Sequence, residues 1–334
     1  MSRRGAATLV AFGALALAAL GAVAFTAPGD DPAAHPGRLV RLPDGRRLNL
    51  RCSGAGSPTV ILEGGFAATS MGWYKVQPLI ARHRRVCSYD RAGYGFSDPG
   101  PLPRDGAAVA RDLDDALRAA GIGGPFVLVG HSAGGLYVRL FADRRPGEVV
   151  GMVLVDPSVE HQDERLAERF GPGAGSLAPQ RARAVRCLDA AVRDALPSVD
   201  PALVVCAPPP RASQSAAAAA AELAQARRPS TWETQISELD TLWGATSREI
   251  DAGRQNYGAM PLVVLTAAGT LDGAPEPARA AALEVWAGLH RQIAARSTRG
   301  SARTIERSTH MMIFDRPDAI AEAVEEVASV RPRQ

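Results

Sequence analysis

Short apolar runs alternate along most of this chain with stretches in which apolar residues recur at helical spacing. The apolar runs predict strands at residues 38–42, 46–52, 59–63, 86–90, 126–129, 149–155, 262–267 and 302–305. Helical spacing predicts helices at residues 72–82, after Asp105, after Ser132, around residues 283–289 and from Pro317 onwards. Because strands and helices alternate, we expect an α/β fold with a mostly parallel, eight-stranded sheet flanked by helices.

The alternation stops between about residues 158 and 260. This stretch is rich in alanine, arginine and proline, and its clearest pattern is one helical face made by Trp232, Ile236, Leu239, Leu242 and Trp243. We therefore expect a helical cap at residues 158–260, inserted before the penultimate strand of a core formed by residues 38–157 and 261–334. The apolar face could pack on that core or face a substrate, and the pattern leaves both open.

The amino-terminal segment has the pattern of an export signal. Arg3 and Arg4 precede an apolar stretch at residues 6–27, which is followed by a linker rich in proline, glycine and aspartate at residues 28–37. Residues 1–27 therefore predict a signal peptide, or a membrane anchor if they stay uncleaved. In either case we expect an exported protein, secreted or held at the outer face of a membrane by residues 6–27.

Composition narrows the classes of partner. The formal net charge of the 334 residues is only +3, and the arginines are dispersed, so nucleic acid is not an expected partner. The four cysteines, Cys52, Cys87, Cys187 and Cys206, show no C-x-x-C spacing, so we expect no metal site. They could form two disulfides in an oxidising compartment or remain four buried thiols.

The sequence Gly130-His131-Ser132-Ala133-Gly134 is the strongest chemical signal in the chain. It has the G-x-S-x-G pattern, it follows a predicted buried strand, and it opens a predicted helix. A sharp strand-to-helix turn of this kind holds a serine hydroxyl exposed, where a neighbouring base can activate it. The pattern predicts that Ser132 is a nucleophile.

The expected base is His310, which lies in a short loop between the last predicted strand and the last predicted helix. Such a loop can direct an imidazole toward the ends of the strands. The other histidines fit this role less well, because they lie in the linker, a basic turn, the motif itself, the cap or a helix (His35, His83, His131, His161 and His290).

Two carboxylates could orient that histidine. Asp272 follows the penultimate strand and Asp156 ends the strand at residues 149–155, so both are expected at the same edge of the sheet. We favour Asp272, because the loop after the penultimate strand is the usual position of the acid when the chain order is serine, acid, histidine. Asp156 remains the alternative acid.

An oxyanion hole needs two backbone N–H donors. The first expected donor is Ala133, the residue after the nucleophile. The second is Phe66, because Gly64 and Gly65 allow the preceding loop to turn inward. A phosphate-binding loop is the competing interpretation, but neither G-x-x-x-x-G-K-[ST] nor G-x-G-x-x-G is present.

Together these residues resemble the α/β-hydrolase superfamily over about residues 38–330, except the cap. The resemblance rests on four segments: Leu62-Glu63-Gly64-Gly65-Phe66, residues 89–97 (YDRAGYGFS), residues 130–134 and His310 with the following DRPD sequence. Many relatives carry His-Gly where this chain has Gly64-Gly65. The strand order that the resemblance implies would bring Cys52 close to Cys87, and a bond between Cys187 and Cys206 would then staple the cap.

The resemblance implies a serine hydrolase that acts through an acyl-enzyme, needs no cofactor and takes a small-molecule acyl substrate. Esters are the expected substrates, with an aminopeptidase or amidase as the alternative. A serine at the nucleophile position argues against an epoxide hydrolase or dehalogenase, for which the resemblance would demand a carboxylate. A non-catalytic binding protein on the same fold is the alternative from a different class.

Overall fold

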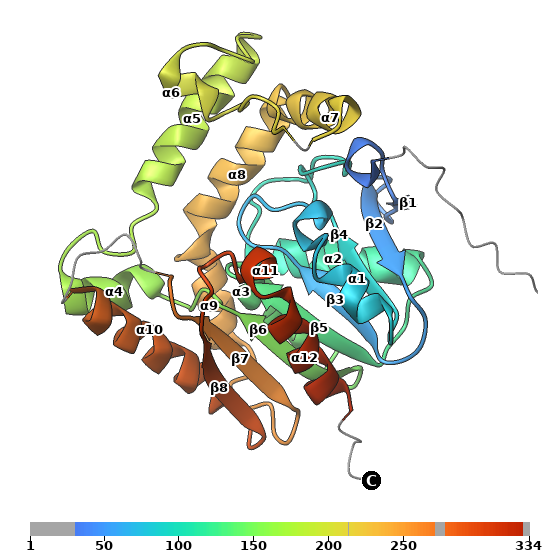
Figure 1. Cartoon of the computed structure of the whole chain (residues 1–334), viewed down its shortest axis with the longest axis vertical. Helices are drawn as coiled ribbons and strands as arrows, with labels where there is room; N and C mark the ends of the chain where they lie inside the picture. Colours follow the sequence, from blue (N-terminus) through green and yellow to red (C-terminus); the bar gives the residue numbers. More distant parts are fainter. Residues whose placement is uncertain (1–30, 213, 271–277, 330–334) are drawn as a thin grey trace, which may run out of the picture. The chain divides into compact units, whose positions relative to one another are not determined.

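The computed structural model describes residues 31–212, 214–270 and 278–329, and a single mixed sheet runs through them (Figure 1). Its strands, in chain order, are β1 (Arg38–Arg41), β2 (Arg47–Ser53), β3 (Thr59–Glu63), β4 (Val86–Tyr89), β5 (Phe126–His131), β6 (Val149–Val155), β7 (Leu262–Ala267) and β8 (Gly300–Ile305). They lie side by side in the order β1-β2-β4-β3-β5-β6-β7-β8. β2 pairs antiparallel with both β1 and β4, and all other pairs are parallel, which confirms the predicted fold class.

Helices cover both faces of the sheet because successive side chains of its central strands point to opposite faces. In β5, Leu128 packs in a cluster with α2 (Gly106–Ala119), α3 (Gly134–Arg144) and α10 (Ala278–Ala294). Its neighbours Val127 and Val129 pack on the other side with α1 (Gln77–Ala81) and α12 (Pro317–Ala328). The central strands β3, β4, β5 and β7 are thus buried on both faces, and their carboxyl ends are left to carry function.

The single helix expected at residues 72–82 is wrong. The structure has a short 3-10 helix, η2 (Ser70–Trp73), followed by α1, which carries Pro78 in its first turn. Proline has no N–H to continue a helix from the preceding turn, so α1 begins anew at Gln77, with Pro78 in the first turn, where no N–H is needed. Asp105 does cap α2 as predicted, by accepting a hydrogen bond from the Ala108 N–H at 2.9 Å.

A group of helices lies between β6 and β7, where the strand–helix alternation of the sequence fails. They are α4 (Gln162–Phe170), α5 (Ala178–Val192), α6 (Pro201–Val204), α7 (Ala216–Ala226), α8 (Pro229–Leu242) and α9 (Ala245–Ala252). In Figure 1, α5 and α8 lie side by side, apart from the sheet. Trp232 and Leu239 of α8 pack in a small hydrophobic core with Cys187 of α5 and Cys206, which follows α6.

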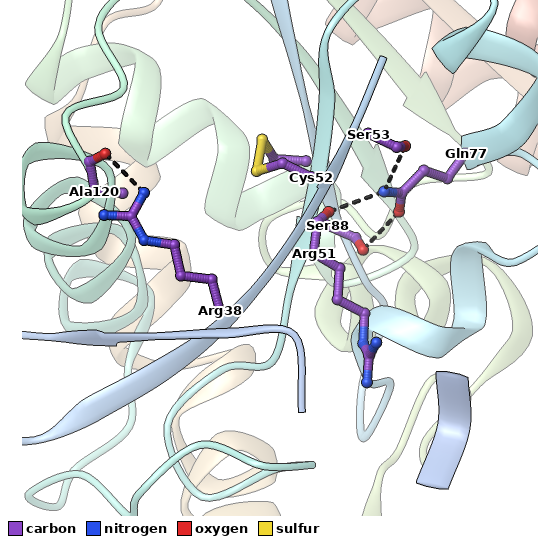
Figure 2. Close-up of a disulfide and its surroundings, with 8 residues drawn as sticks. Arg38, Arg51, Cys52, Ser53, Gln77, Ser88 and Ala120 are labelled. Atoms are coloured by element: carbon purple, nitrogen blue, oxygen red, sulfur yellow. Dashed lines mark hydrogen bonds between the residues drawn. A yellow bond between two sulfur atoms is a disulfide. The ribbon is translucent and has the colours of Figure 1, made fainter. Parts of the chain in front are cut away.

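Both cysteine pairings that the resemblance implies are present. Cys52 and Cys87 are register partners on β2 and β4, and their disulfide is shown in Figure 2. Beside it, the Gln77 amide donates to the Arg51 carbonyl oxygen and accepts from the Ser88 hydroxyl, which ties α1 to the same two strands (Figure 2). Cys187 and Cys206 join α5 to the segment after α6. Two disulfides fit an extracellular or lumenal protein.

The predicted signal or anchor, residues 1–27, and the first part of the linker lie outside the described residues. Within the described part of the chain, none of the helices has the length and apolar character needed to cross a membrane.

Candidate active site

Ser132 lies at the turn between β5 and α3, with a left-handed backbone (φ +54°) that non-glycine residues adopt rarely. The flanking glycines make this turn possible. A Cβ at Gly130 would lie 2.5 Å from the Gly134 carbonyl oxygen, and one at Gly134 would lie 2.6 Å from the Glu63 carbonyl oxygen. The G-x-S-x-G sequence is therefore a steric requirement of the close approach between this turn and the end of β3.

His310 lies in the loop after β8, and its ring contacts two groups from other strands. Its Nε2 is 3.0 Å from the Ser132 Oγ, and its Nδ1 is 2.7 Å from the Asp156 Oδ2. A carboxylate can only accept, so Nδ1 carries the proton and Nε2 is free to accept from the serine hydroxyl. The three side chains form one hydrogen-bonded line across the carboxyl ends of β5, β6 and the β8 loop.

Asp156 is fully buried at the end of β6, and each of its carboxylate oxygens has two donors. Oδ1 accepts from the Ala267 N–H at 3.0 Å and the Trp286 Nε1 at 2.9 Å. Oδ2 accepts from His310 and from the Thr270 hydroxyl. Burial by itself raises the pKa of Asp156, but the hydrogen bond and charge of His310, aided by His290 and Thr270, lower that pKa below its ordinary value.

The acid favoured from sequence, Asp272, lies outside the described residues, so its position stays a prediction. The alternative acid, Asp156, is the carboxylate that contacts His310 Nδ1. This nitrogen carries a single proton, so a second carboxylate would have no hydrogen bond to receive there. The carboxylate that the structure shows at His310 is therefore Asp156, and the role of Asp272 stays a prediction.

His131, which the sequence does not predict to be the base, supports the site. Its Nε2 donates to the backbone carbonyl oxygen of His310 at 2.8 Å, which holds the histidine loop against β5. Burial, with the nearby His310, lowers the pKa of His131 to about 4, so the ring is neutral at physiological pH. The sequence feature that could have indicated this supporting role is the position of His131 at the end of a buried strand.

His290 supports the site from the opposite side. It is fully buried on α10, where its Nδ1 accepts from the Thr266 hydroxyl at 2.7 Å and its Nε2 donates to the Pro157 carbonyl oxygen at 3.0 Å. This pair of bonds holds the residue after Asp156 in place. Helical periodicity gave no sign of this role.

The loop at residues 63–68 approaches Ser132 closely. A Cβ at Gly65 would lie 3.1 Å from the Ser132 Cβ, so glycine is what allows this loop to pack on the nucleophile. Phe66 and Ala133, the two predicted donor residues, line the same cavity as Ser132. Ala133 also precedes the first turn of α3, where the helix dipole favours negative charge.

A cavity of about 550 Å³ opens over Ser132 and His310 between the core and the cap. Leucine, phenylalanine and tryptophan side chains dominate its described lining: Phe66, Leu166, Phe170, Leu177, Leu239, Leu242, Trp243 and Trp286. His310 is the one titratable residue among the described lining residues. The cavity therefore suits an uncharged, apolar group next to the hydroxyl of Ser132.

Comparison with known proteins agrees with this architecture. Residues 58–191 match the family model described as alpha/beta hydrolase fold. An AB hydrolase superfamily protein of Gibberella zeae is 36% identical over 113 residues, which cover 33% of this chain and 35% of the relative. The chain aligns with less than half of the length of this and other curated relatives.

Two solved structures share the fold across most of the described chain. The epoxide hydrolase CorEH superposes with a TM-score of 0.61 at 16% identity, covering 87% of this chain and 98% of that enzyme. An enol-lactonase from Burkholderia xenovorans superposes with a TM-score of 0.58 at 15% identity, covering 88% of this chain and 100% of that one. At these identities the likeness concerns the fold.

Proposed function

We propose that this chain is a serine hydrolase of the α/β-hydrolase superfamily that cleaves ester bonds through an acyl-enzyme on Ser132. The match of residues 58–191 to the alpha/beta hydrolase fold model supports the family. The observation that carries the proposal is the unbroken line from the Ser132 hydroxyl through His310 to Asp156, with contacts of 3.0 Å and 2.7 Å. A nucleophile, a base and an orienting acid in this geometry are the parts that acyl transfer needs.

In the first half of the reaction, His310 Nε2 takes the hydroxyl proton as the Ser132 Oγ bonds to the ester carbonyl carbon. The backbone N–H groups of Phe66 and Ala133 stabilise the resulting oxyanion. Asp156 stays ionised and stabilises the imidazolium. When the carbon–oxygen bond of the ester breaks, His310 returns the proton to the departing alcohol.

In the second half, water attacks the acyl-enzyme and gives its proton to His310. The bond to the Ser132 Oγ breaks, His310 returns the proton to that oxygen, and the carboxylic acid leaves. Proton, nucleophile and leaving group therefore balance without a cofactor.

The cavity lining supports an apolar acyl group over a peptide amino terminus. An aminopeptidase must hold a charged α-ammonium group, and buried charges need a partner of opposite sign. No Asp or Glu is among the described residues that line the cavity. We therefore propose small esters with an uncharged, aliphatic or aromatic acid part as the substrates.

The test is labelling of the purified protein with a fluorophosphonate probe, together with hydrolysis of p-nitrophenyl esters. We expect Ser132→Ala to abolish labelling and to lower kcat by at least about 10³-fold, because the nucleophile is removed. Ser158 lines the same cavity, so Ser158→Ala is the matched control and should still be labelled. A wild-type protein that takes no label, or equal labelling of wild type and Ser132→Ala, would contradict the proposal.

We also propose that the protein works outside the cytosol, either secreted or held at the membrane by residues 6–27. The two disulfides and the apolar stretch after Arg3-Arg4 support this location. Edman sequencing of the mature protein would distinguish a cleaved from a retained segment.

A further inference from the structure

The Arg91 side chain lies buried beneath the loop that precedes Phe66. It follows β4 and is 2% exposed. Its Nη1 donates to the Gly64 carbonyl oxygen at 2.9 Å, and its Nη2 donates to the Gly65 carbonyl oxygen at 2.8 Å. Residues 64 and 65 are both glycine, so the loop has no side chain of its own at these positions to hold its shape.

The other contacts of Arg91 are buried carboxylates. Nη1 pairs with Glu63 at 2.8 Å, and Nε pairs with Glu238 of α8 at 2.9 Å. Both carboxylates are 1% exposed. Burial acts to lower the pKa of Arg91, but Glu238 and Glu63 raise that pKa well above its ordinary value, so the side chain stays a cation.

The helix that carries Glu238 is seated tightly on the segment that carries Arg91. The Tyr94 hydroxyl donates to Glu238 at 3.0 Å. A Cβ at Gly93 would lie 2.1 Å from the Thr234 hydroxyl oxygen, so α8 and this segment are in direct contact. Leu239 and Leu242, near the end of the same helix, line the cavity above Ser132. One guanidinium thus joins the loop at residues 63–68, called the oxyanion loop below, to α8, which forms a wall of the cavity.

The geometry points to Arg91 as a positioning residue for the oxyanion hole, one that also makes helix α8 a fixed wall of the active site. The Gly65 carbonyl and the Phe66 N–H belong to one planar trans peptide, so they point in opposite directions. A hydrogen bond from Arg91 to that carbonyl therefore sets the direction of the Phe66 N–H. This inference rests on the proposed function for the role of Phe66 as an oxyanion donor.

The test compares Arg91→Met with Arg139→Met. Arg139 is an equally buried arginine, 1% exposed and paired with the buried Glu160 at 2.8 Å, but its described contacts are remote from the oxyanion loop. Both variants lose a buried ion pair, so both should be destabilised. Only Arg91→Met should release the loop.

The first measurement is hydrogen–deuterium exchange of the backbone amides at residues 64–68 and in α8, which needs no turnover. We expect exchange in both regions to rise at least tenfold in Arg91→Met and to stay near the wild-type rate in Arg139→Met. Unchanged exchange of the loop in Arg91→Met overturns the inference, even if the protein proves not to be a hydrolase.

The second measurement is ester hydrolysis per folded molecule. Loss of a single oxyanion donor typically lowers kcat about 10²–10³-fold, so a misdirected Phe66 N–H should lower kcat about 10–10²-fold. KM should change less than about threefold, because the acyl cavity remains. If the wild type hydrolyses the ester and Arg91→Met has the same kcat, the inference is overturned and the proposed function stays intact.

Arg91→Lys keeps the test decisive if the methionine variant does not fold. Lysine retains the charge, but one ammonium group cannot reproduce the planar fork that reaches two carbonyls and two carboxylates. We expect an intermediate fall in kcat and intermediate exchange of the loop. Wild-type values for both would contradict the role.

Discussion

The core and the cap contribute to the same cavity in different ways. At the strand ends of the core, polar atoms have specific partners: both oxygens of Asp156 accept two hydrogen bonds, and both nitrogens of His310 are engaged. The described cap residues that face the cavity are mostly apolar and none is charged, such as Leu166 of α4 and Leu242 of α8. Hydrogen bonds need fixed geometry, whereas apolar contacts depend on area. In the function that we propose, the core supplies the catalytic groups and the cap supplies the apolar surface that selects the substrate.

Glu238 is the exception that joins the two regions. It belongs to the cap by sequence, but its buried carboxylate pairs with Arg91, whose other bonds hold the oxyanion loop of the core. The polar core and the apolar cap are therefore distinct where they line the cavity, but below the cavity a carboxylate of the cap takes part in the polar contacts of the core.

Substitution of the two candidate acids tests most strongly whether the polar groups at the strand ends of the core carry the chemistry. We expect Asp156→Asn to lower kcat about 10³–10⁴-fold, because an amide stabilises neither the imidazolium nor the required tautomer of His310. Asp272→Asn is the matched variant and should keep kcat within about threefold. Ester hydrolysis with circular dichroism as a folding control measures both. The reverse pattern would return the acid role to Asp272.

A second test concerns how the stability of the core depends on pH through His131, at the end of β5. The pKa of His131 is lowered from 6.5 to about 4 in the folded protein, so on acidification the unfolded state takes up the proton first. The contribution to stability is complete above pH 6.5 and is lost as the pH falls through about 4. By linkage it amounts to about 3 kcal/mol.

Urea unfolding at pH 7.5, 5.5 and 4 measures this contribution. We expect the free energy of unfolding of His131→Asn to depend less steeply on pH than that of the wild type. The exposed His83 supplies the control, and His83→Asn should follow the wild-type curve. If His131→Asn did so too, the buried ring would not be the source of the acid sensitivity.

The smallest expected effect tests the cap. Leu166 lines the cavity, so Leu166→Glu places a charge beside the acyl group and should lower kcat/KM for a hexanoyl ester about tenfold. This corresponds to lost burial of roughly two methylene groups at about 0.8 kcal/mol each. An acetyl ester should be affected less than about twofold. Val192→Glu, at an exposed position of α5, is the control. Equal losses for both esters would place Leu166 in the catalytic machinery.

Most of the core could be predicted from sequence because its signals are local. Apolar runs marked the strands, and β6 spans the residues expected for it, Val149–Val155. The same local patterns pointed to Ser132 and His310, whose side chains lie 3.0 Å apart although 178 positions separate them. The helix predicted at residues 72–82 is divided because Pro78 cannot continue a preceding helical turn, which apolar spacing does not reveal.

By itself, the sequence determined the order of strands and helices, the nucleophile turn and the loop that carries the histidine, because each depends on neighbours in the chain. Tertiary structure alone decided that Asp156 meets His310, that His131 holds the histidine loop, and that Arg91 bridges the Gly65 carbonyl and Glu238. These contacts join distant elements through side chains with directional hydrogen bonds, and no local pattern records the direction in which a side chain points.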